Sequence, residues 1–127
     1  MGIFILVQFG GERMKINRTT AFKVWNYYFG NAEYAEDFHG NYMCKNAFGK
    51  RNYYEVINGM RVYCGWNLHH VLPKACGGTN KFENLLCTNI ITNDMAEDKV
   101  TFCIDDCYYQ VKRIYGSRDH EIVRIKY

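Results

Sequence analysis

Two adjacent histidines near the middle of the chain are its most chemically informative residues. His69 and His70 lie in the stretch WNLHHVLPKACGGTNKFEN, which runs from Trp66 to Asn84. An imidazole titrates near neutral pH, so it can take a proton from water, and in its neutral form it can bind a metal ion. Neighbouring side chains on a strand point to opposite faces. Both histidines can therefore serve one site only where a strand ends or twists.

A proline, a glycine pair and two asparagines follow the histidines. They are Pro73, Gly77, Gly78, Asn84 and Asn93. The two asparagines come 14 and 23 positions after the second histidine. The proline and the glycines predict a tight loop, because proline has a fixed backbone angle and glycine adopts conformations that other residues avoid. Each feature alone is common in ordinary loops, so the combination carries the information.

Elements that would position these residues can be predicted from the local pattern. The histidines end a strand-like stretch, and the apolar run Leu85–Cys87 suits a second short strand. Thr92 or Asn93 then begins a helix. Asp94 would lie in its first turn and Lys99 near its end, which suits the helix dipole. The order is strand, glycine loop, strand and helix.

This segment closely resembles the HNH endonuclease motif, which is built on a ββα-metal unit. In that family an acid or a histidine precedes the catalytic histidine. A proline, a glycine loop, an asparagine before leucine and a later histidine or asparagine follow. The resemblance covers Trp66 to Lys99, about a quarter of the chain. The spacing is similar to that of the HNH domain of RNA-guided CRISPR nucleases, and the paired histidines are similar to those of nuclease colicins.

The resemblance implies a role for each polar residue of the motif. His70 would be the general base that takes a proton from the attacking water. His69 and Asn93 would supply a nitrogen and an oxygen to one divalent metal ion, which neutralises the phosphate and stabilises the leaving oxygen. Asn84 would be a catalytic residue of another kind, because it bonds backbone groups across the loop and so orients the base. The alternative is that the histidines have no catalytic task and the glycines and Asn84 serve loop architecture alone.

The identity of the metal ion is left open by the residue at position 69. Many family members have aspartate where His69 stands, and a carboxylate suits Mg²⁺ better than an imidazole does. We expect Mg²⁺ or Mn²⁺, with Ni²⁺ or Zn²⁺ as alternatives. Family members often add a four-cysteine zinc site, but no CxxC pair occurs here. We interpret the six cysteines as buried, reduced thiols, with zinc binding as the alternative; they are Cys44, Cys64, Cys76, Cys87, Cys103 and Cys107.

DNA is the substrate that the resemblance implies, cut to a 5′-phosphate and a 3′-hydroxyl. A net charge of +3 permits a polyanionic partner without requiring one. Three lysines flank the motif and are expected to contact phosphates, with ordinary solvated lysines as the alternative: Lys74, Lys81 and Lys99. A C-terminal basic cluster extends this surface: Lys112, Arg113, Arg118, Arg124 and Lys126. No helix-turn-helix or zinc finger accompanies the motif, so strong sequence specificity would need a protein partner.

Composition predicts one globular domain, residues 1–127, of the α+β class. A chain of 127 residues with 48% hydrophobic and 23% charged residues can bury one core and is not disordered. The ββα-metal (HNH) core would carry additional β-hairpins and short helices. No stretch approaches a membrane span and no secretory signal precedes the cysteines, so we expect a cytoplasmic protein without membrane contact. The aromatic residues suit either core edges or stacking on bases.

Two helices are predicted before the motif. The first spans Thr20–Phe29, with Thr20 as its cap and Gly30 as its stop. The second is a short helix around Ala32–Asp37, within an otherwise loop-like segment. His39 follows it, and a lone histidine of this kind is expected at the surface.

Hairpins are predicted at two turn signals. Asn58-Gly59 lies between two β-prone runs, which is the strongest short hairpin signal in a sequence. A second hairpin is expected around Asp105-Asp106, followed by a last strand over residues 121–127.

The first residues allow two readings. Gly10 to Arg13 can be written with purine-only codons and Met14 follows at once, which is how a ribosome-binding site looks when it is translated by mistake. Met14 would then be the biological start and residues 1–13 a mis-assigned beginning. The alternative is that Ile3–Val7 is a real edge strand. The small size and this start suit a phage or mobile-element gene.

A second function is compatible with the same motif. A non-cleaving ββα-metal scaffold could act as a phage-type nucleic-acid-binding protein or nuclease inhibitor. The presence of His70 and Asn93 favours the endonuclease, because a scaffold that only binds has no need of a general base.

Overall fold

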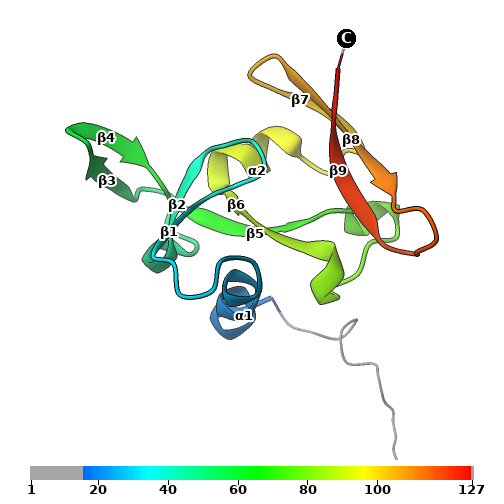
Figure 1. Ribbon diagram of the computed structural model, residues 1–127, viewed down its shortest axis with the longest axis horizontal. Helices are drawn as coiled ribbons and strands as arrows, with labels where there is room; N and C mark the ends of the chain where they lie inside the picture. Colours follow the sequence, from blue (N-terminus) through cyan, green and yellow to red (C-terminus); the bar gives the residue numbers. More distant parts are fainter. Residues whose placement is uncertain (1–15, 127) are drawn as a thin grey trace, which may run out of the picture.

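The computed structural model describes residues 16–126, and these contain two α-helices and nine short strands (Figure 1). Every strand pair is antiparallel, so the predicted α+β class is confirmed. The possible mis-assigned start and the Ile3–Val7 strand lie outside the described residues. The elements are α1 (Arg18–Phe29), β1 (Tyr34–Glu36), β2 (Tyr42–Cys44), β3 (Tyr54–Ile57), β4 (Met60–Tyr63), β5 (Trp66–His70), β6 (Leu85–Asn89), α2 (Ile90–Ala96), β7 (Thr101–Ile104), β8 (Cys107–Arg113) and β9 (His120–Ile125).

Helix α1 covers the predicted segment, but its cap was predicted wrongly. Asn17 is the cap, because its side-chain oxygen accepts a hydrogen bond from the backbone N–H of Thr20 at 2.9 Å. Thr20 lies inside the helix and is buried. Gly30 ends the helix as predicted, with a φ of 60° that glycine adopts easily.

The short helix predicted around Ala32–Asp37 is wrong, because this segment contains strand β1, which pairs with β2. The carboxylate of Asp37 organises the turn between them. It accepts hydrogen bonds from the backbone N–H groups of His39 and Asn41 at 3.0 and 2.9 Å. These local bonds favour a hairpin over the helix that the residue pattern suggests.

His39 is not the surface residue that we predicted. Its side chain is 9% exposed; Nδ1 lies 2.6 Å from the hydroxyl of Tyr109 and Nε2 lies 3.0 Å from the carboxylate of Asp105. These contacts tie the β1–β2 turn to the hairpin formed by β7 and β8.

Both predicted hairpins are confirmed. Asn58 and Gly59 connect β3 to β4 with φ angles of 51° and 78°. Asp105 and Asp106 connect β7 to β8 with φ angles of 48° and 65°. Two successive residues with positive φ match the twist of the flanking strands. The predicted last strand is also present, as β9 beginning at His120.

The motif segment forms the pair β5–β6 followed directly by α2. Helix α2 begins earlier than the predicted start at Thr92 or Asn93. Asn89 caps it, with its side-chain oxygen accepting a backbone N–H of the first turn at 2.9 Å. Asn93 consequently lies within the helix, Asp94 is not in its first turn, and Lys99 lies beyond its end.

Two apolar clusters hold the β5–β6 pair in place. In Figure 1, α1 lies below this pair, and α2 with the three-stranded sheet β7–β8–β9 lies above it. The first cluster packs Trp25 of α1 against Trp66 and Leu85. The second packs Ala96 of α2 against Phe102 and its neighbours in the three-stranded sheet. The motif strands are therefore supported from both sides.

The cysteines differ in exposure, so the interpretation that all are buried is wrong. Cys44, Cys64 and Cys87 are buried in the first cluster, while Cys76 and Cys103 are exposed. Burial raises the pKa of the Cys64 thiol to about 11, and it raises that of Cys87 to about 12, so both thiols stay protonated and unreactive at neutral pH. No helix within residues 16–126 is long and apolar enough to cross a membrane.

Candidate active site

His69 and Asn93, the predicted metal ligands, meet where α2 packs on β5. Nδ1 of His69 lies 2.6 Å from Oδ1 of Asn93. An amide oxygen only accepts hydrogen bonds, so Nδ1 carries the proton in this contact and donates it. The amide N–H of Asn93 donates to the backbone oxygen of Leu68 at 3.5 Å, which turns the amide oxygen toward the imidazole. The two candidate ligands therefore converge on one point.

Burial sets the protonation state of His69. The residue is only 6% exposed, and loss of water around the ring lowers its pKa below the usual value near 6.5. The hydrogen bond to Asn93 acts in the opposite direction and is the smaller effect. His69 is accordingly neutral at neutral pH, which is the form that binds metal ions.

His70 is half-buried and has a different partner. Its Nε2 lies 2.7 Å from Oδ1 of Asn80, in the loop between β5 and β6. Because that oxygen accepts, the contact selects the tautomer with the proton on Nε2. The lone pair is then on Nδ1, so Nδ1 is the atom that can take a proton. Sequence reasoning missed Asn80, whose only signal is a polar side chain inside the glycine loop.

The two histidines use the end of strand β5 in different ways. His69 bonds to the helix and His70 bonds to the loop, as expected for neighbours on a strand that point to opposite faces. The strand ends at His70. The rings still affect each other, because a charge on His70 lowers the pKa of His69.

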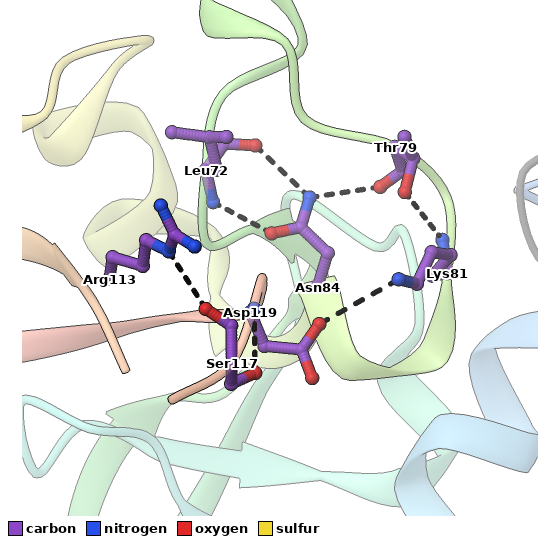
Figure 2. Close-up of polar contacts among 7 residues, drawn as sticks. All are labelled: Leu72, Thr79, Lys81, Asn84, Arg113, Ser117 and Asp119. Atoms are coloured by element: carbon purple, nitrogen blue, oxygen red, sulfur yellow. Dashed lines mark hydrogen bonds and ion pairs between the residues drawn. The ribbon is translucent and has the colours of Figure 1, made fainter. Parts of the chain in front are cut away.

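Asn84 joins the two ends of the loop with three hydrogen bonds (Figure 2). Its side-chain oxygen accepts from the N–H of Leu72 at 2.8 Å, and its amide donates to the backbone oxygens of Leu72 and Thr79 at 3.1 and 2.9 Å. The backbone oxygen of Asn84 also accepts from the N–H of Val71 at 2.9 Å. These bonds continue the β5–β6 ladder beyond His70, so they hold the backbone that carries the candidate base.

Gly78, the second glycine of the pair, leaves no room for a side chain. A Cβ on Gly78 would lie 1.7 Å from the backbone oxygen of Leu72 and 2.9 Å from the amide nitrogen of Asn84. A side chain at this position would push the loop off Asn84. Gly77 is required by conformation, because its φ of 98° is in the left-handed region.

Two of the three predicted phosphate-binding lysines already face an acidic side chain. Lys81 faces Asp119 across 3.7 Å, and Lys99 faces Glu97 across 3.7 Å. Lys74 is exposed at the start of a short 3-10 helix. Contact of these lysines with nucleic acid stays a prediction.

His69 and Asn93 are the residues that could offer a nitrogen and an oxygen to a divalent ion, and their direct hydrogen bond would have to open to admit it. Within residues 16–126, no group of three or more His, Cys, Asp or Glu side chains is placed to hold a metal ion. The protein would therefore supply an imidazole nitrogen and an amide oxygen, and water would supply the rest, as is common for Mg²⁺. An open hollow lies beside Asn93 and does not include His69 in its lining; it is lined by Arg51, Asn67, Asn93, Asp94, Glu97, Asp98 and Lys99.

Comparison of the chain with models of protein families, with curated proteins and with solved structures gives no match. Inference about function therefore starts from the residues and their geometry. The structure brings His69 to Asn93, places His70 next to His69 along β5 with its ring toward the loop, and joins Asn84 to the backbone that follows His70.

Proposed function

We propose that this chain is a metal-dependent HNH endonuclease that hydrolyses phosphodiester bonds of DNA. The observation that carries the proposal is the contact between His69 and Asn93, with His70 next along the strand. The order β5, glycine loop, β6, α2 supports it further, because strand, loop, strand and helix is the order of a ββα-metal unit.

His69 and Asn93 would hold the divalent ion. A bound ion neutralises charge on the phosphate and stabilises the departing oxygen. The amide oxygen suits Mg²⁺ or Mn²⁺, and the imidazole nitrogen also suits Ni²⁺ or Zn²⁺, which are the alternatives. To bind an ion through Nδ1, the neutral imidazole of His69 would carry its ring proton on Nε2 instead, so no net release of a proton is expected at neutral pH.

His70 would take the proton from the attacking water through Nδ1. Asn80 keeps the other ring nitrogen protonated and so prevents the wrong tautomer. Asn84 holds the backbone that follows the base, and in doing so limits the positions that the imidazole can adopt. A general base of this kind contributes about 10²–10⁴-fold to the rate.

Cleavage of supercoiled plasmid tests the proposal. Metal-free protein is incubated with DNA in EDTA and with added Mg²⁺, Mn²⁺, Ni²⁺ or Zn²⁺, and the ends of the products are identified. We expect cleavage only with a divalent ion, leaving a 5′-phosphate and a 3′-hydroxyl. Undiminished cleavage by metal-free protein in excess chelator contradicts the mechanism. Binding in a gel shift without cleavage in any ion supports the non-cleaving scaffold instead.

A further inference from the structure

A hollow with a volume of about 340 Å³ lies between the loop that joins β5 to β6 and the turn that joins β8 to β9. The two walls come from segments far apart in the sequence. The residues drawn in Figure 2 include parts of both walls. The first wall consists of Leu72, Gly77, Gly78, Thr79, Lys81 and Asn84, and the second of Arg118, Asp119 and His120.

The lining favours a small anion. Lys81, Arg118 and His120 bring basic side chains, against one carboxylate from Asp119. The volume is at the low end for ligand sites, which range from roughly 300 to 1,000 Å³. Among the residues that the structure describes, the lining contains no Phe, Tyr or Trp on which a base could stack. A phosphate group matches this size and charge better than a nucleobase does.

An ion pair joins the two walls. Nζ of Lys81 lies 3.7 Å from a carboxylate oxygen of Asp119 (Figure 2). The pair is long and both side chains are partly exposed, so another anion can compete with Asp119 for the lysine. The turn itself is fixed, because the Asp119 N–H donates to the Ser117 hydroxyl at 2.9 Å and Arg113 donates to the Ser117 backbone oxygen at 2.8 Å.

The hollow adjoins the candidate active site through one shared residue. The side chain of Asn84 lines the hollow and also bonds to the backbone that follows His70. A phosphate bound in the hollow would therefore lie against Asn84 and Leu72, and Leu72 is two residues beyond the candidate base. A backbone phosphate next to the cleaved one is an anion that DNA offers at such a position.

We propose that this hollow binds a backbone phosphate of DNA, with Arg118 and Lys81 as the charged contacts. Asp119 holds Lys81 while no phosphate is bound. The inference rests on the proposed function only for the source of the phosphate. Arg118, in the β8–β9 turn, lies outside the motif of residues 66–99. Its contact with a phosphate is therefore not implied by the resemblance.

The experiment measures binding of a labelled DNA duplex in EDTA, where metal-dependent cleavage does not occur, over a series of salt concentrations. Arg118→Ala is expected to weaken binding and to reduce the slope of log K against log salt by about 1. Asp119→Asn is expected to strengthen binding, because it releases Lys81. Arg61→Ala is the matched control: it removes one exposed arginine from β4, a residue that does not line the hollow.

Three outcomes overturn the inference. In the first, Arg118→Ala and Arg61→Ala have the same small effect. In the second, Asp119→Asn leaves binding unchanged or weaker although circular dichroism shows the native fold. In the third, inorganic phosphate competes with DNA equally well for the wild type and for Arg118→Ala. Loss of DNA binding in Arg118→Ala supports the inference even if the wild type never cleaves DNA, so its failure and that of the proposed function are distinguishable.

Discussion

At the scale of single residues, two identical side chains acquire different properties from their partners. His69 is buried against α2 and is kept neutral, while the ring of His70 is half-buried and oriented by Asn80. Neutrality suits a metal ligand, and a defined tautomer suits a base. Under the proposed function, the neighbouring positions on β5 would divide two chemical tasks that the same residue type can perform.

Burial of His69 predicts a dependence of stability on pH. Because the pKa of His69 is lowered by folding, the unfolded chain takes up a proton at a higher pH than the folded chain does. As pH falls below about 6.5, the usual pKa of histidine, the free energy of unfolding should therefore decrease. The decrease continues until pH passes the lowered pKa of the folded state.

His69→Gln removes this titration and should make the decrease shallower. The measurement is urea-induced unfolding of metal-free protein at a series of values from about pH 7.5 to about pH 5. His120→Gln, which removes an imidazole outside the buried contact, is the control. Equal pH slopes for the wild type and His69→Gln contradict the assignment of the buried, neutral imidazole.

At the scale of elements, the loop between β5 and β6 is the structure that positions the candidate base. The side chain of Asn84 offers both an acceptor and a donor to Leu72, as a neighbouring strand would. Gly78 permits the close approach that these bonds need. The strand pair therefore continues past His70 through one backbone bond, from Val71 to Asn84, and then through the side chain of Asn84.

Asn84→Asp should loosen this loop, because a carboxylate cannot donate to the backbone oxygens of Leu72 and Thr79. An unsatisfied buried polar group costs about 1–3 kcal/mol, so we expect a loss of that order in the free energy of unfolding, together with slower cleavage. Asn26→Asp on the exposed face of α1 is the matched control. Its oxygen accepts from Lys45 at 3.2 Å, a bond that a carboxylate also makes.

Urea unfolding and the plasmid assay check this prediction together. Equal stability and cleavage in the two variants would show that Asn84 does not hold the loop. Reduced cleavage with unchanged stability would show that Asn84 acts on the reaction in some other way.

Turns were predictable from the sequence because their chemistry is local. Asn58-Gly59 and Asp105-Asp106 accept positive φ angles, and both hairpins formed where predicted. The start of α2 was missed because its cap depends on a distant residue. The backbone N–H of Asn89 donates to the carboxylate of Asp37 at 3.0 Å, and Asp37 also closes the turn that follows β1, the strand in the segment that was predicted to be a helix.

The candidate site was predictable only as far as its motif extends. The spacing of His69, His70, Asn84 and Asn93 is a property of one segment. The partner of His70 and the approach of Asp119 to Lys81 depend on which loops meet in space, and hydrophobic periodicity carries no information about that.

At the scale of the whole molecule, the motif strands are fixed between two apolar clusters. Trp66 and Leu85 belong to the cluster with α1, and Val71 belongs to the cluster beneath the three-stranded sheet. The contacts of His39 add a further tie between the β1–β2 turn and the β7–β8 hairpin. The residues beside the site are therefore held by packing, which is the rigid support that a catalytic arrangement needs.

The division of roles between the two histidines is the central claim, and one paired measurement tests it most directly. Metal affinity by calorimetry and cleavage of supercoiled plasmid are determined for the wild type, His70→Ala and His69→Ala. We predict that His70→Ala loses about 10²–10⁴-fold in cleavage rate while its metal affinity stays that of the wild type. His69→Ala should bind the ion more weakly. Loss of metal binding in His70→Ala, with unchanged metal binding in His69→Ala, would contradict the account.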